Sequence, residues 1–144
     1  MKKVILLIIL LTAGCSNKME KNHLQEFDFK CPKSPNCVSS LENEESKKVE
    51  PIKFDSDPGK ALGQIEKILM EMKRCKIILK TDTKIHAVCT SLVFRFRDDL
   101  YFEADSEKKI INIKSASRTG YFDFGVNRKR AEKIIEKFYR ISNP

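Results

Sequence analysis

Apolar residues follow three different spacings along this chain, and each spacing predicts a different structure. Residues 4–11 form an unbroken apolar run, which is too short for the ~20 residues that span a bilayer. From residue 58 to 73, and again after residue 127, apolar residues recur every three or four positions, as in amphipathic helices. Between residues 75 and 116 they alternate with polar residues, as in strands. The order predicts an α+β domain, with an antiparallel sheet of about four to five strands and two helices on one face.

The two predicted helices have clear apolar stripes. Asp57 is a favourable N-cap residue for the first helix, and Pro58 suits its first position. The stripe expected in the core consists of Leu62, Ile65, Leu69 and Met72, with Ala61 and Ile68 beside them. The stripe of the last helix consists of Ala131, Ile134, Ile135, Phe138 and Ile141.

The strand region is predicted to begin with a hairpin whose loop has three residues. In such a hairpin the two strands pair residues whose numbers sum to 164, so that one face is apolar. The expected pairs are Cys75 with Cys89, Ile77 with Ala87, and Leu79 with Ile85.

The second strand of this hairpin is predicted to continue to Phe96. Phe94 and Phe96 alternate with arginines, which gives one apolar and one charged face. Asp98 and Asp99 are predicted to form a turn or a bulge. Two further strands, at 100–105 and 110–117, flank a polar turn.

The start of the chain predicts export. Lys2 and Lys3 precede the apolar run, and LTAGC follows it, so that residues 1–14 resemble a bacterial lipoprotein signal with Cys15 as the lipidated residue. Thr12 stands where such signals usually have Leu. The alternative is an ordinary cleaved signal with a coincidental cysteine.

Lipidation, for example with palmitate, would anchor the protein to a membrane outside the cytoplasm. Ser16 favours the outer membrane, facing the periplasm, in a Gram-negative cell, because resemblance to sorted lipoproteins places Asp there for inner-membrane retention. Residues 15–30 are predicted to form a polar tether, and residues 31–144 a single domain.

The cysteine count agrees with export. With Cys15 lipidated, four cysteines remain, and in an oxidising compartment they allow three pairings. We predict the pairs Cys31–Cys37 and Cys75–Cys89, because the first pair encloses a short loop and the second faces across the hairpin. The alternative is buried free thiols, which behave as small apolar groups.

The chain has a formal net charge of +8, and removal of two lysines with the signal leaves +6. A basic balance often indicates nucleic-acid binding, but export argues against that partner. Anionic lipid, a cell-wall polymer or an acidic protein are the expected partners. No cofactor and no metal are predicted.

Four segments in this order resemble the family catalogued as domain of unknown function 1499. They are SPNCVSS (34–40), IHAV (85–88), FRFRDD (94–99) and SASRTGYFDFGVNRKR (115–130). The resemblance covers roughly residues 31–140 and implies kinship with exported bacterial and plastid proteins, but no settled activity. The family pattern usually has Arg where Lys114 stands, and a more polar residue where Phe122 stands.

Segment 115–130 is predicted to join the last strand to the last helix. Its two glycines permit unusual backbone angles, and Asn127 is predicted as the N-cap. The three cations at 128–130 then lie in the first helical turn, where the helix dipole disfavours each of them by roughly 0.3 to 1 kcal/mol. Local rules are often broken in this way at functional sites.

Two arrangements would offset this cost. Internally, arginines would form bidentate ion pairs with carboxylates; the residues concerned are Asp98, Asp99 and Asp123 with Arg118, Arg128 and Arg130. Externally, the helix start with Arg128, Lys129 and Arg130 would bind a phosphate or a carboxylate of a partner. For Arg118 and Asp123 we favour a structural ion pair at a tight joint between strand and helix. For residues 128–130, internal pairing and binding of an external anion both stay open.

His86 is the remaining polar residue of interest. With Asp98 or Asp99 and one of three serines (Ser91, Ser115 and Ser117) it would form a small hydrolase site. The same histidine and aspartates contain metal-ligating atoms, but one histidine is thin support for a metal. A hydrogen-bonded structural histidine is the favoured prediction, so no catalytic residue is assigned. The expected function is a non-enzymatic binding or structural module.

Overall fold

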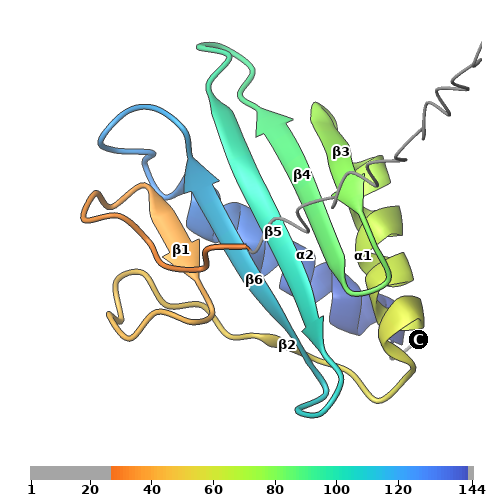
Figure 1. Cartoon of the computed structure of the whole chain (residues 1–144). Helices are drawn as coiled ribbons and strands as arrows, with labels where there is room; N and C mark the ends of the chain where they lie inside the picture. The colour runs from red at the N-terminus through yellow and green to blue at the C-terminus, as the bar shows by residue number, and fades with distance from the viewer. Residues whose placement is uncertain (1–26, 143–144) are drawn as a thin grey trace, which may run out of the picture.

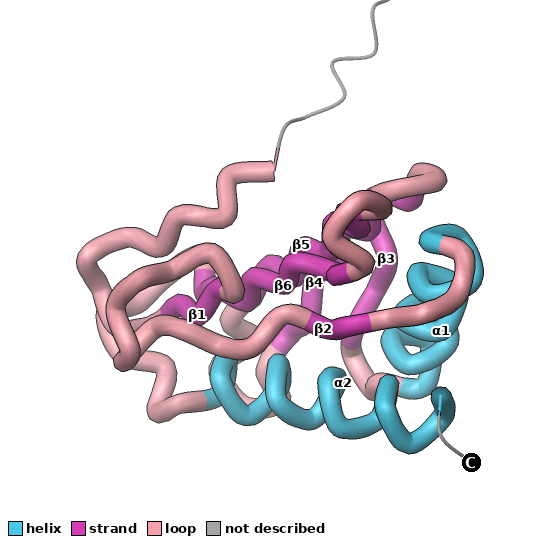
Figure 2. Tube along the Cα trace, turned by 90° about the horizontal axis from the view of Figure 1, so that it is seen from below, coloured by secondary structure: helices cyan, strands magenta, loops and turns pink. Residues whose placement is uncertain are grey.

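One antiparallel sheet of six strands carries both helices on the same face, in a computed structural model that describes residues 27–142 (Figure 1, Figure 2). The predicted signal peptide, Cys15 and most of the predicted tether lie outside the described residues. The elements are β1 (Cys37–Ser39), β2 (Ile52–Lys53), α1 (Pro58–Glu71), β3 (Cys75–Lys80), β4 (Lys84–Thr90), β5 (Arg97–Asp105), β6 (Ile110–Ser117) and α2 (Val126–Ser142). The α+β prediction is confirmed.

The sheet has more strands than predicted. Its order is β1-β6-β5-β4-β3, and β2 also pairs with β6. A short strand before the first helix is expected from IKF (52–54) and corresponds to β2, but β1, whose three residues are all buried, is not predicted. A strand of three residues without exposed positions has no alternation, and so periodicity does not reveal it.

The β3–β4 hairpin keeps the predicted register for only half of its length. Cys75 pairs with Cys89, and Ile77 with Ala87, as predicted. Beyond Ile77 the register shifts by one residue, and Leu79 lies opposite His86. The prediction that Leu79 faces Ile85 is therefore wrong, because an extra residue in β3 forms a bulge that hydrophobic patterning does not indicate.

Both predicted disulfides are confirmed. Cys31 is bonded to Cys37, and Cys75 to Cys89. Disulfides of this kind are stable in oxidising compartments, so the pair indicates an exported protein. None of the helices within residues 27–142 is long and apolar enough to cross a membrane.

The region between β4 and β5 differs from the prediction. β4 ends at Thr90, and residues 91–96 form a loop rather than more strand. Ser91 and Phe96 close this loop, because each donates its backbone N–H to an oxygen of the other. Asp98 and Asp99, predicted as a turn or bulge, both lie within β5. The chain turns before these aspartates because Arg95 takes a left-handed backbone conformation with φ 54°.

The core fills the space between the sheet and the helices. Asp57 caps α1 as predicted, since its carboxylate accepts hydrogen bonds from the N–H groups of Gly59 and Lys60. The predicted stripes are buried, with Met72 and Ile135 partly buried. Ile141, predicted in the stripe of α2, is exposed at the end of that helix.

The opposite face of the sheet, which we call the open face, carries no helix. Residues 27–32 run across it as an extended segment (Figure 2). Phe27 and Phe29 are buried there. The packed domain therefore includes residues 27–30, which the sequence analysis assigned to the tether.

Candidate functional site

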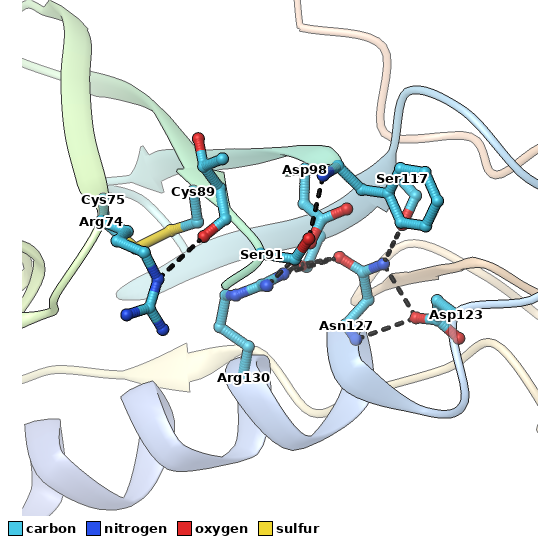
Figure 3. A network of polar contacts seen from close by, with 12 residues as sticks. Arg74, Cys75, Cys89, Ser91, Asp98, Ser117, Asp123, Asn127 and Arg130 are labelled. Carbon is cyan, nitrogen blue, oxygen red and sulfur yellow. Dashed lines mark hydrogen bonds and ion pairs between the residues drawn. A yellow bond between two sulfur atoms is a disulfide. The ribbon is translucent and has the colours of Figure 1, made fainter. Parts of the chain in front are cut away.

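A buried ion pair lies between the start of α2 and the sheet (Figure 3). Arg130 donates to the Asp98 carboxylate at 2.7 Å, and their side chains are only 11% and 4% exposed. Asp98 comes from the helix-covered face of β5, and Arg130 comes from the second turn of α2. The pair therefore fixes the helix to the sheet, and the predicted internal pairing of Arg130 is the one observed.

Asn127 is the centre of the polar network around this pair (Figure 3). Its side-chain oxygen accepts hydrogen bonds from Ser115 and Arg130, and its amide nitrogen donates to Ser117 and Asp123. The same amide also donates to the backbone carbonyl of Asn36. Every one of these residues lies in one of the segments on which the family resemblance is based.

The prediction that Asn127 is the N-cap of α2 is wrong. The helix begins at Val126, so Asn127 already lies in its first turn. Asp123 takes the capping role, since its carboxylate accepts from the N–H groups of Gly125 and Asn127. A carboxylate at this position is also stabilised by the partial positive charge at the N-terminal end of the helix dipole.

The three consecutive cations of α2 have three different environments. Arg130 is buried in the ion pair with Asp98. Arg128 donates to the carbonyl of Ser46 at 3.0 Å and lies 3.6 Å from Glu132. Lys129 is exposed and takes part in no ion pair within residues 27–142. Only Lys129 and part of Arg128 are left to bind an external anion.

The predicted pairing of Arg118 with Asp123 is also wrong. Arg118 follows β6 on the open face, where it binds both oxygens of Asp99 at 2.8 Å. The joint between β6 and α2 depends instead on the Asp123 cap and on two glycines with positive φ, Gly120 (87°) and Gly125 (74°).

A second polar cluster occupies the open face of the sheet. His86 Nε2 lies 2.7 Å from Asp99, and the His86 ring stacks on Tyr101 with centroids 4.5 Å apart. Burial opposes ionisation of Asp99, but the hydrogen bonds from Arg118 and His86 outweigh it and lower its pKa below the usual value. Burial, followed by the charge of Asp99, raises the pKa of Tyr101.

The extended segment at the start of the domain covers this cluster. Lys114 Nζ donates to the backbone carbonyls of Asp28 and Lys30 at 2.7 and 2.8 Å. The Phe27 ring lies 4.8 Å from that of Tyr101. Burial lowers the pKa of Lys114, although neighbouring carboxylates oppose this. These two hydrogen bonds from Lys114 therefore hold the segment against the sheet.

The serines and the histidine of the suggested hydrolase do not meet. Ser115 and Ser117 bond to the Asn127 network on the helix side, whereas His86 faces the open side. Ser91 accepts the N–H of Phe96 within its own loop. Within residues 27–142, Asp99 is the one side chain that hydrogen-bonds His86, and no group of three His, Cys, Asp or Glu residues has a metal-binding arrangement.

A family model described as "Protein of unknown function (DUF1499)" matches residues 29–138. The chain belongs to this family. A comparison with curated proteins finds no significant match. The four segments that suggested DUF1499 in the sequence supply the whole Asn127 network, and they supply His86, Asp99 and Arg118 of the open-face cluster. In this DUF1499 domain these residues hold the start of α2 to the sheet, whereas Lys114, which lies outside the four segments, binds the N-terminal segment.

The sequence analysis did not predict an exposed apolar surface, which lies at the end of the domain where β6 joins α2. The loops 91–96 and 118–125 both leave the upper end of the sheet in Figure 1. Their large side chains are exposed: Leu92, Val93, Phe94, Phe96, Tyr121, Phe122 and Phe124, together with Val126. The sequence contains a feature that could have indicated this surface: in segments 92–96 and 121–126, aromatic residues stand directly beside arginine, aspartate or glycine. Such neighbours are unusual in a buried strand.

A basic concavity of about 390 Å³ adjoins this apolar surface on the open face. Its lining includes four cations, Arg74, Lys76, Arg97 and Arg118, and no acidic residue. Arg118 is engaged by Asp99, whereas Arg97 forms no ion pair within the described residues. The concavity was not predicted, because its cations come from three separate strand ends.

Proposed function

We propose that this DUF1499 protein is an envelope lipoprotein, anchored through lipid on Cys15, whose domain is a non-enzymatic binding module. The signal-like residues 1–14 and the two disulfides support export. A Gram-negative cell would place it on the outer membrane, facing the periplasm.

The binding surface is the end of the domain that carries the loops 91–96 and 118–125, at the top of Figure 1. Arg95, Arg97 and Lys129 belong to none of the ion pairs formed among residues 27–142. This is the observation that carries the proposal, because cations that contribute nothing to internal pairing are free to bind phosphate or carboxylate groups. The basic corner therefore consists of Arg95, Arg97 and Lys129, with Arg128 at its margin, and does not include Arg130.

The partner is expected to be anionic lipid, an anionic cell-wall polymer or an acidic protein. All three present phosphates or carboxylates outside the cytoplasm, and electrostatic binding to each weakens with salt. The compartment argues against nucleic acid.

A charge-matched pair of variants tests this function. We expect the triple variant Arg95→Gln, Arg97→Gln, Lys129→Gln to lose at least tenfold in affinity for vesicles of equimolar phosphatidylglycerol and phosphatidylcholine, since each cation near such a surface contributes about 1 kcal/mol. The control, Lys60→Gln, Lys67→Gln, Lys73→Gln, removes the same charge from exposed positions in or just after α1.

The control should bind like wild type. Equal losses in both variants would reduce the effect to net charge, and no loss in the first variant would contradict the proposed corner. The same comparison with a purified anionic cell-wall polymer separates polymer from lipid.

One observation favours a second candidate function. The 2.7 Å contact of His86 with Asp99 is the geometry of a general base held by a carboxylate. Because no serine within residues 27–142 lies beside His86, a hydrolase using this pair would have His86 activate a water molecule or a hydroxyl group of the substrate as the nucleophile. The substrate would enter from the open face. This function would be supported if the wild-type protein hydrolyses generic ester substrates and the variant His86→Ala does not, although its melting temperature equals that of wild type.

A further inference from the structure

Exposed apolar side chains are concentrated at one place in the described domain. Twelve large apolar side chains are exposed within residues 27–142, and eight of them lie in the segments 92–96 and 121–126. We call these eight residues the aromatic tip: Leu92, Val93, Phe94, Phe96, Tyr121, Phe122, Phe124 and Val126. A contiguous exposed apolar patch of this kind marks an interaction surface in a monomeric protein.

The aromatic tip is maintained against local backbone preference. Phe124 is 91% exposed and has a left-handed backbone with φ 55°, which is a conformation that favours glycine over bulky residues. Arg95, between two exposed phenylalanines, has φ 54°. Neither residue gains internal burial that would offset this conformation, so folding alone does not explain them.

The two loops of the aromatic tip are fixed from below. A hollow of about 270 Å³ between them is lined mainly by apolar side chains, with Asp98, Ser117 and Asp123 among its few polar residues. These three residues belong to the network of Asn127 and Arg130 (Figure 3). The network therefore presents the loops in a defined position, which reduces the entropy cost of binding.

Cations surround the aromatic tip. Arg95 and Arg97 lie within and directly after the first loop, Arg118 is the first residue of the second, and Lys129 lies one turn into α2. Apolar side chains inserted among acyl chains, with basic side chains at the level of the phosphates, are the arrangement of proteins that bind anionic membrane surfaces. An acidic protein partner would complement the cations but not eight exposed apolar groups.

We propose that the aromatic tip inserts into the interface of an anionic lipid bilayer, with the basic corner on the lipid phosphates. This inference rests on the proposed function and names its partner. The anchor permits it: the chain from Cys15 to Phe27 reaches at most about 40 Å when extended. Phe27 contacts Tyr101, which lies only about 14 Å along β5 from Arg97.

The absence of tryptophan from the chain allows a direct test. Phe124→Trp places one fluorescent reporter at the aromatic tip, and Met70→Trp places a matched one on α1, at a site that is also largely exposed (75%). Both are made in the chain from Ser16 onward, which retains the complete described core and both disulfides.

Equimolar phosphatidylglycerol and phosphatidylcholine vesicles are then added, with and without brominated acyl chains. We expect the Phe124→Trp emission to shift to shorter wavelength and to be quenched by the brominated chains, while Met70→Trp changes in neither respect. We also expect Phe94→Ser, Phe122→Ser, Phe124→Ser to lower vesicle affinity more than tenfold, with an unchanged melting temperature as the check on folding.

Other outcomes identify what is wrong. If wild type binds vesicles but Phe124→Trp is neither shifted nor quenched, the insertion fails while the anionic-partner function stands. If quenching occurs and the charge variant binds as tightly as wild type, insertion stands and the basic corner fails. An emission shift that depends on protein concentration without vesicles would overturn the proposal in favour of a second copy of the chain.

Discussion

At the residue scale, two arginine–aspartate pairs of identical chemistry have different roles because their burial differs. Arg130 and Asp98 are buried between α2 and the sheet, whereas the Arg118 side chain is 41% exposed on the open face. Removing one partner of a buried pair leaves an uncompensated charge and costs about 3–5 kcal/mol. Exposed pairs typically contribute about 0.2–1 kcal/mol.

We therefore expect Arg130→Ala to destabilise the domain by about 3–5 kcal/mol, and Arg118→Ala by no more than about 1 kcal/mol. Urea unfolding of both variants at neutral pH measures the difference. Similar losses for the two variants would mean that the network under α2 is not what holds the helix to the sheet.

The lowered pKa of Asp99 predicts a particular response to acid. A carboxylate whose folded-state pKa is depressed stabilises the protein above its ordinary pKa of about 3.9, and this contribution is lost as the pH falls through the folded-state pKa. The difference in unfolding free energy between wild type and Asp99→Asn should thus be constant above about pH 5 and shrink in more acidic solution.

Urea unfolding of the two proteins between neutral pH and about pH 3 provides the measurement. Asp82→Asn, in the exposed β3–β4 turn, serves as the control substitution. A difference that stays constant or grows in acid would show that Asp99 is not held ionised by Arg118 and His86.

At the scale of elements, the loop between β6 and α2 contains an exposed residue, Phe124, whose left-handed backbone lowers the stability of the domain. Phe124→Gly relieves a left-handed conformation, so it should stabilise the domain by up to about 1 kcal/mol. The nearby Gly125→Ala should destabilise it by about 1 kcal/mol, because Gly125 also has positive φ. Thermal unfolding of the pair tests both signs, and a loss of stability in Phe124→Gly would mean that this ring contributes to folding.

The sequence predicted elements that have a period and missed those that do not. The stripes of α1 and α2, the cap at Asp57 and both disulfides follow from local spacing. β1 is too short for a period, and the loop 91–96 alternates like a strand although it is not one. Alternation reports the backbone only where one side is buried, and Phe94 is exposed.

The candidate site was predictable as a set of residues but not as a set of contacts. The aspartates and arginines were identified together, yet Asp98 and Asp99 point to opposite faces because they are adjacent in β5. Arg118 therefore meets Asp99, Arg130 meets Asp98, and Asp123 is left to cap α2. These partners depend on strand register, which the residue types alone do not determine.

At the scale of the whole molecule, the domain is asymmetric. The helices cover one face of the sheet, and the N-terminal segment, held by Lys114, crosses the other (Figure 1, Figure 2). The aromatic tip lies at one end, near cations that form no ion pair within residues 27–142. The DUF1499 segments hold this end together from inside. In the proposed function these segments present the binding surface.

The most direct test of this account is hydrogen–deuterium exchange of the chain from Ser16 with and without anionic vesicles. The account predicts new protection confined to residues 91–98 and 118–130, with no change in the 40–48 loop or the β5–β6 turn. Protection confined to those other loops, or to the groove lined by Phe27, Leu41 and Lys84 on the open face, would contradict it.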